Sequence, residues 1–105
     1  MKEITVQELK MKIDNKEDFQ LIDVREVHEY DICNLGGELI PMGSILDKTD
    51  LISADKPVII HCKSGSRSGA VITELERRHG FKNLLNLKGG ILAYAKQIDP
   101  LLPLY

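Results

Sequence analysis

One apolar segment restricts the possible folds of this chain more than any other, namely Val58-Ile59-Ile60-His61-Cys62. It is continuous and rich in β-branched residues, and it lacks the polar–apolar alternation of a strand with one wet face. Strands of this kind occur inside parallel sheets that are covered on both faces. A helical pattern begins at Ser66 or Ser68, runs to about His79 and ends at Gly80, a usual residue after a helix C-terminus. The segment therefore predicts a central parallel strand followed by a helix.

The rest of the chain also alternates between short apolar segments and helical patterns. Thr5-Val6-Gln7-Glu8 is typical of a capping box, and it predicts a first helix with Leu9 and Ile13 on its inner face. Pro100 and Pro103 are expected to end the ordered chain. Further strands are expected at 19–24 and 83–87, an extended piece at 39–41, and helices at 26–31, 44–52 and 91–98. We predict a three-layer α/β fold in which helices cover both faces of a mainly parallel central sheet.

Composition excludes several classes of protein. The 105 residues are 43% hydrophobic and 29% charged, close to an average globular protein, and we predict a single domain over residues 1–105. A net charge of −2 does not favour a nucleic acid or an anionic membrane as the partner. No apolar run approaches the roughly 18 residues of a membrane-spanning helix, and the N-terminus lacks the apolar core of a secretion signal. We expect a cytoplasmic monomer.

The two cysteines, Cys33 and Cys62, are too few for a disulfide scaffold and lie in no pattern typical of zinc ligands. Free thiols fit a reducing compartment, and we predict no metal and no organic cofactor. For Cys33 the favoured interpretation is an ordinary buried thiol. The alternative is a resolving thiol that captures a sulfur from Cys62.

The chemistry is predicted to lie in the segment Cys62-Lys63-Ser64-Gly65-Ser66-Arg67-Ser68, between the central strand and the helix. A loop at this place can turn successive backbone N–H groups toward one centre, and the helix N-terminus adds partial positive charge there. Such surroundings lower the pKa of a thiol, whose thiolate is the nucleophile. We predict that Cys62 is a covalent catalyst with an anionic adduct. The predicted substrate-binding residues are Lys63, Ser64, Gly65, Ser66, Arg67 and Ser68.

Two reaction classes use a cysteine followed closely by an arginine in such a loop, namely phosphoester hydrolysis and sulfur transfer through a persulfide. Cysteine-dependent phosphatases place five residues between the two, which makes a loop wide enough for phosphate. Here only four residues separate Cys62 from Arg67, and no Asp soon after the loop could serve as the leaving-group acid. The shorter loop favours a single terminal sulfur, and the phosphatase remains the less favoured alternative.

Three segments in order resemble the signatures of the rhodanese family. They are Leu21-Ile22-Asp23-Val24-Arg25-Glu26 with Glu29-Tyr30, the Cys62–Ser68 loop, and Asn83-Leu84-Leu85-Asn86-Leu87-Lys88-Gly89-Gly90-Ile91. The likeness covers about residues 4–103. The stretch from Ile32 to Pro41 and the ending Ile98-Asp99-Pro100 are most similar to rhodanese domains fused to the adenylyltransferases that serve sulfur-carrier proteins.

The resemblance implies a rhodanese-like α/β fold and a sulfurtransferase. Cys62 would take sulfane sulfur from a donor such as thiosulfate and pass it to a thiol, cyanide or a sulfur carrier. Backbone amides from Lys63 to Ser68 would hold the persulfide, and Lys63 and Arg67 would attract an anionic donor. A non-catalytic persulfide carrier or docking module is the alternative from a different class.

Three further polar residues have predicted structural roles. Asp23 and Arg25 point to the same side of a strand end, which favours an ion pair that braces the loop. His61 precedes Cys62 on the strand and should point to the opposite face, which favours packing behind the loop over a role as general base.

Overall fold

The computed structural model describes residues 1–105, and a five-stranded parallel sheet forms its centre. The strand order is β1-β5-β4-β2-β3, and every neighbouring pair is parallel. The strands are β1 (Glu3–Ile4), β2 (Gln20–Asp23), β3 (Glu38–Leu39), β4 (Val58–His61) and β5 (Leu84–Leu87). All four residues of β4 are buried between β2 and β5, so the apolar segment does form the central strand.

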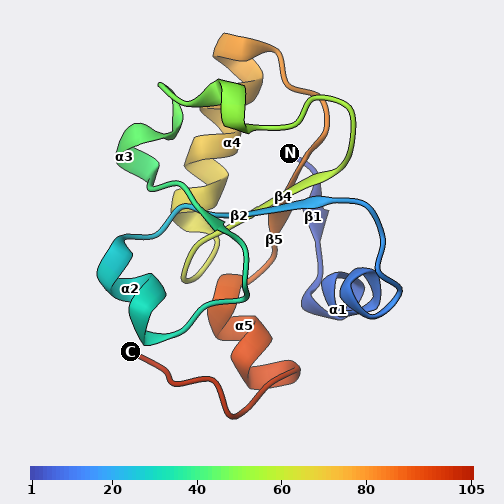
Figure 1. Ribbon diagram of the computed structural model, residues 1–105, viewed down its shortest axis with the longest axis vertical. Coiled ribbons are helices and arrows are strands. Elements are labelled where there is room, and N and C mark those ends of the chain that lie inside the picture. The colour runs from blue at the N-terminus through green and yellow to red at the C-terminus, as the bar shows by residue number, and fades with distance from the viewer.

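Helices cover both faces of the sheet, as Figure 1 shows, with α3 and α4 on one side and α1 and α5 on the other. The α-helices are α1 (Val6–Asp14), α2 (Val27–Ile32), α3 (Met42–Ile45), α4 (Ser66–His79) and α5 (Gly90–Gln97). A 3₁₀ turn, η1, covers Thr49–Leu51. The predicted three-layer α/β fold is therefore confirmed. No helix combines the length and the apolar character that a membrane crossing needs.

The side chains of β4 alternate between the two cores. Val58, Ile60 and the following Cys62 join the cluster beneath α3 and α4, whereas Ile59 joins the cluster beneath α1 and α5. This alternation follows from the two-residue period of a strand. It places Cys62 directly beyond the carboxyl end of the central strand, on the side of α4.

Local signals predicted the helix ends well. The Thr5 side chain accepts a hydrogen bond from the backbone N–H of Glu8, and the Glu8 carboxylate accepts one from the N–H of Thr5, which confirms the capping box. The C-cap of α4 is Gly80, whose φ of +69° lies in the left-handed region that favours glycine.

Three expectations are wrong, and one strand was missed. Ile13 is not on the inner face of α1, because its side chain is 38% exposed. Residues 44–52 do not form one helix; α3 ends at Ile45, and η1 follows after a turn. Strand β1 was not predicted, since two residues carry no periodicity. The ordered chain does not end at the prolines, because Tyr105 is hydrogen-bonded within the fold.

Candidate active site

The loop after β4 curls around the sulfur of Cys62. Its Sγ accepts hydrogen bonds from the backbone N–H of Gly65 at 3.1 Å and of Ser68 at 3.4 Å. The hydroxyl of Ser68 lies 3.3 Å from the same sulfur. Gly65 allows the curl because its φ of +107° is strained for any other residue. The thiol therefore sits in a ring of donors at the N-terminus of α4.

Asn86 on β5 fixes this ring from the side of the sheet. Its amide nitrogen donates to the carbonyl oxygen of Gly65 at 3.1 Å, and its amide oxygen accepts from the Ser68 hydroxyl at 2.6 Å. Asn86 belongs to a segment that the sequence singled out, but no role was predicted for it. Only the pairing of β4 with β5 shows that it reaches the loop.

The N-terminus of α5 holds the outer side of the loop. The backbone N–H of Ile91 donates to the carbonyl of Cys62 at 3.0 Å, and that of Leu92 donates to the carbonyl of Lys63 at 3.1 Å. These bonds occupy the loop carbonyls. Gly90, with a φ of +62°, lets the helix come this close, since a Cβ there would lie 2.7 Å from the Cys62 carbonyl oxygen.

Opposing effects act on the pKa of the Cys62 thiol. Burial raises this pKa, but the hydrogen bonds from the side chain and backbone of Ser68 and from the backbone of Gly65 and Ser64 outweigh burial and lower it. A lowered pKa increases the fraction of thiolate at neutral pH. The surroundings of Cys62 therefore favour the thiolate form.

Replacing Ser68 by Ala is expected to raise the pKa of Cys62, because the thiolate loses the hydrogen bond that the Ser68 hydroxyl offers when its single proton turns from Asn86 to the sulfur. The pH profile of iodoacetamide alkylation measures this directly. The alkylation rate rises with pH because the thiolate fraction grows, and in Ser68→Ala this rise should occur at higher pH. The alkylation rate at pH 7 should be lower by up to about tenfold. Ser66→Ala is the control, because its hydroxyl contacts Ser64 and not the sulfur. An unshifted pH profile in Ser68→Ala would contradict the assignment.

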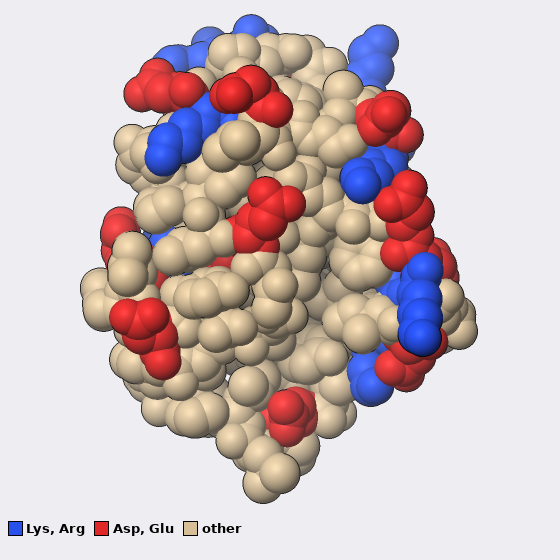
Figure 2. Space-filling model, in the orientation of Figure 1, with Lys and Arg blue, Asp and Glu red and all other residues tan.

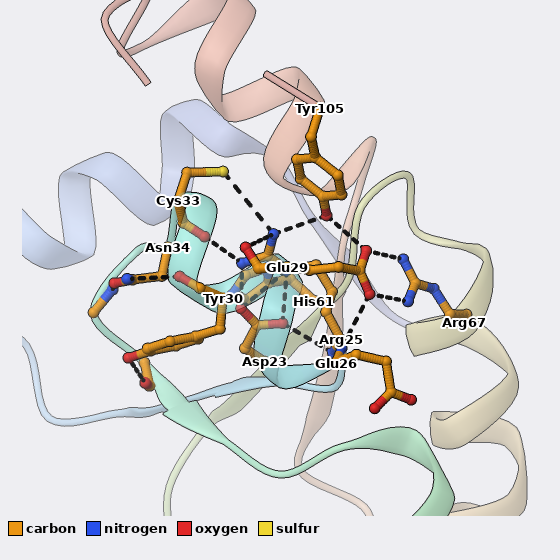
Figure 3. A network of polar contacts seen from close by, with 12 residues as sticks. Asp23, Arg25, Glu26, Glu29, Tyr30, Cys33, Asn34, His61, Arg67 and Tyr105 are labelled. Atoms are coloured by element: carbon orange, nitrogen blue, oxygen red, sulfur yellow. Dashed lines mark hydrogen bonds and ion pairs between the residues drawn. The ribbon is translucent and has the colours of Figure 1, made fainter. Parts of the chain in front are cut away.

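Arg67 is not free at the mouth of the loop. Its guanidinium forms two hydrogen bonds with the carboxylate of Glu29 on α2, at 2.7 and 2.9 Å (Figure 3). This pairing holds the pKa of Glu29 well below its usual range. The loop itself contains no acid, but the fold brings one to it from a segment 38 residues away.

The remaining predicted binding residues lie around the mouth. The ammonium of Lys63 lies 4.3 Å from the centre of the Tyr105 ring, a cation–π contact. The hydroxyls of Ser64 and Ser66 lie 3.3 Å apart on the exposed side of the loop. The structure thus brings Gly65 and Ser68 to the sulfur, while the side chains of Lys63 and Arg67 contact other elements.

Behind the loop lies a buried polar network, shown in Figure 3. Arg25 is fully buried and pairs with Asp23 at 2.7 Å, so the predicted ion pair is confirmed. Arg25 also donates to the carbonyl of Cys33 at 2.7 Å and to the Tyr105 hydroxyl at 2.8 Å. The pair therefore braces the end of α2 and the C-terminal segment, and it reaches the loop indirectly, through Glu29 and Tyr105.

His61 and Cys33 both lie near this network. His61 is fully buried, with its Nε2 3.7 Å from the Asp23 carboxylate, and burial lowers its pKa, which favours the neutral ring. Packing behind the loop is what its strand position predicted.

Cys33 is also buried, and its sulfur lies 4.0 Å from the Arg25 guanidinium. These contacts are separate from those of Cys62.

Two features define the rhodanese-like class of domain. One is a parallel sheet with a cysteine just after its central strand, and the other is a six-residue loop whose backbone N–H groups donate to the sulfur of that cysteine. The model of the rhodanese-like domain family matches residues 5–97. The chain belongs to this family.

Several relatives agree with this membership. The chain is 36% identical to the putative sulfurtransferase YtwF of Bacillus subtilis, over 95% of this chain and 96% of that protein. It is 35% identical to the probable adenylyltransferase/sulfurtransferase MoeZ of Mycobacterium tuberculosis over 97% of this chain, but it spans only 26% of MoeZ. It likewise spans 38% of the rhodanese-like/PpiC domain-containing protein 12 of Arabidopsis thaliana, with 36% identity.

Solved structures share the fold. The protein SSP1007 of Staphylococcus saprophyticus superposes with a TM-score of 0.81 at 34% identity, covering 93% of this chain and 97% of that one. A rhodanese-like domain protein of Staphylococcus aureus gives a TM-score of 0.80 at 33% identity, covering 90% and 91%.

Proposed function

We propose that this protein is a sulfurtransferase that carries sulfane sulfur as a persulfide on Cys62. The thiolate attacks the outer sulfur of a donor such as thiosulfate. The S–S bond of the donor breaks, sulfite leaves with the electron pair, and the sulfur remains on Cys62 as a persulfide anion. A thiol, cyanide or a sulfur carrier then attacks the terminal sulfur and regenerates the thiolate.

The observation that supports this proposal is the ring of donors around Cys62 Sγ. A thiolate and a persulfide are both anions, and backbone N–H groups fixed in advance stabilise such charge without reorganisation. The loop residues Lys63, Ser64, Gly65, Ser66, Arg67 and Ser68 would surround the donor. This transfer conserves atoms and charge and requires no metal or cofactor.

The names of relatives support protein partners. YrkF of Bacillus subtilis, 30% identical over 85% of this chain, is named a putative sulfur carrier protein, and MoeZ is named an adenylyltransferase as well as a sulfurtransferase. A protein donor or acceptor of sulfur is therefore proposed beside small molecules. Two unpaired thiols fit the reducing cytoplasm, where we place this activity.

The second candidate is a persulfide carrier that exchanges sulfur with a partner protein and turns thiosulfate over slowly. The pairing of Arg67 with Glu29 favours it, because a neutralised guanidinium attracts a small dianion less strongly. Fast persulfide uptake from a cysteine desulfurase beside slow thiosulfate turnover would support this carrier. The same pairing weakens the phosphatase alternative, since Arg67 is not free for a phosphate.

The proposal is tested by intact-protein mass spectrometry. Incubation with thiosulfate, or with a cysteine desulfurase and cysteine, should add the mass of one sulfur atom. Cyanide should remove this sulfur and release thiocyanate in equal amount. A protein that retains no sulfur from either donor would contradict the proposal, and Cys62-dependent hydrolysis of an aryl phosphate would support the phosphatase instead.

A further inference from the structure

The C-terminal segment of the chain returns to the active site. After α5 the half-buried Leu102 packs on the core beneath α1 and α5, and the chain then ends beside α2 (Figure 1). There the Tyr105 hydroxyl accepts a hydrogen bond from Arg25 and donates one to Glu29, both at 2.8 Å (Figure 3). Its ring also lies beneath the ammonium of Lys63.

Tyr105 therefore contacts Lys63 directly and contacts Glu29, the partner of Arg67. Arg67 is bound by Glu29, and Tyr105 donates to the same carboxylate oxygen that Arg67 approaches at 2.9 Å. Lys63 forms no ion pair, and its described contact is with the Tyr105 ring. A cation on a ring keeps its full charge but loses its freedom to turn toward an anion.

The exposed charges around this region agree with such shielding. In Figure 2 most of the visible Lys and Arg side chains lie along the top and the right of the view, with further basic atoms at the upper left and the left side. The lower left, where Figure 1 places α2 and the C-terminus, shows acidic and uncharged atoms.

We propose that Tyr105 is a specificity-determining residue, which holds Lys63 on its ring and supports the Glu29–Arg67 pair, so that the site disfavours small dianionic donors relative to less charged ones. The role of Tyr105 in donor choice rests on the sulfur transfer proposed above. The role of Tyr105 in arranging the charges at the mouth of the loop does not rest on it, and this role can be measured without any sulfur donor.

The first measurement is the alkylation of Cys62 by two reagents of similar size. Iodoacetate is an anion and iodoacetamide is neutral, and both react with the thiolate. The ratio of their rates therefore reports the charge that meets an approaching anion, while a change in thiolate fraction cancels. Peptide mass analysis assigns the label to Cys62 rather than Cys33.

In Tyr105→Leu the iodoacetate to iodoacetamide ratio is expected to rise about threefold at low salt, because the released Lys63 can reach the anion. The substitution changes no charge, so a rise must come from rearrangement. The gain should shrink at 1 M salt. Tyr105→Phe keeps the ring and should show a clearly smaller rise. An unchanged ratio in Tyr105→Leu, or an equal rise in both variants, would overturn the proposal.

A double-mutant cycle with Lys63→Met assigns the effect to one pair. Removing the ammonium should lower the ratio more in Tyr105→Leu than in the unmutated protein, since only there is Lys63 free. If Lys63→Met changes the iodoacetate to iodoacetamide ratio equally in both backgrounds, the proposed contact between Lys63 and Tyr105 is wrong. The contact can also be measured by NMR in the unmutated protein, which does not depend on whether a variant folds. The ring current of Tyr105 should shift the ε-methylene protons of Lys63 upfield. Unshifted ε-methylene protons would overturn the proposed contact.

Donor choice is tested last, with the dianion thiosulfate and the monoanion benzenethiosulfonate. In Tyr105→Leu, KM for thiosulfate should fall relative to KM for benzenethiosulfonate, with kcat for both changed less. If the alkylation ratio rises but neither donor transfers sulfur, the proposed function fails and the role of Tyr105 in arranging charge stands. If both donors react and the ratio of their KM values is unchanged, the specificity role fails and the proposed function stands.

Discussion

Cys62→Ala is expected to lose sulfur transfer completely, by about a thousandfold or more in rate, as removal of a catalytic nucleophile does elsewhere. The ring of donors would remain around an alanine that cannot form the persulfide bond. Mass spectrometry after incubation with a sulfur donor should show no added sulfur. The thiocyanate assay should fall to the uncatalysed rate.

Cys33→Ala is the matched control, because it removes the other thiol of the chain. Cys33 is buried beside Arg25 and shares no described contact with Cys62, so this variant should still gain one sulfur atom. Retention of sulfur by Cys62→Ala would show that Cys62 is not the nucleophile. Loss of sulfur in Cys33→Ala, with the fold intact, would revive the resolving or relay thiol as an interpretation of Cys33.

Gly90→Ala is expected to disrupt the active-site loop from outside. A Cβ at this position would lie 2.6 Å from the carbonyl carbon of Lys63 and 2.7 Å from the carbonyl oxygen of Cys62, and the backbone φ of +62° is strained for alanine. Crowding against backbone, with this strain, should cost about 3 kcal/mol of unfolding free energy. Sulfur transfer should fall at least about tenfold, since relief requires the loop carbonyls, and with them the N–H groups around the sulfur, to move.

Urea unfolding and the pH profile of Cys62 alkylation test this together. The unfolding midpoint should fall, and the rise in alkylation rate should move to higher pH as the thiolate loses its donors. Gly43→Ala is the control, because a Cβ there meets nothing within 4 Å. A Gly90→Ala protein with unchanged stability and an unchanged Cys62 profile would mean that α5 does not hold the loop.

Much of the fold follows from local patterns. The capping box at Thr5 and the glycine at 80 define helix ends through hydrogen bonds and backbone strain within a few residues, and the sequence carries both. Ile13 and residues 44–52 were predicted wrongly because periodicity alone does not say how far a helix stays in contact with the sheet. The ordered C-terminus was missed because the partners of Tyr105 lie 76 and 80 residues away.

The candidate site divides in the same way. A thiol after a buried strand, a glycine that permits the curl and a helix N-terminus are consecutive in the chain, so the ring of donors around Cys62 could be predicted from residues 58–68 alone. Asn86, Gly90 and Glu29 could not be assigned roles, although all three lie in segments that the sequence singled out. Each acts through a contact made by another strand or helix.

The sequence by itself therefore determined where the proposed nucleophile lies and why a thiolate there is stabilised, since these depend on short-range backbone geometry. Only the tertiary structure decided which charges a donor meets. From the loop alone, Lys63 and Arg67 were expected as free cations that attract an anion, but α2 brings Glu29 to Arg67 and the C-terminus brings Tyr105 to Lys63. The physical reason is that electrostatic partners are chosen by distance in space, which the packing of α2 and the C-terminal segment sets.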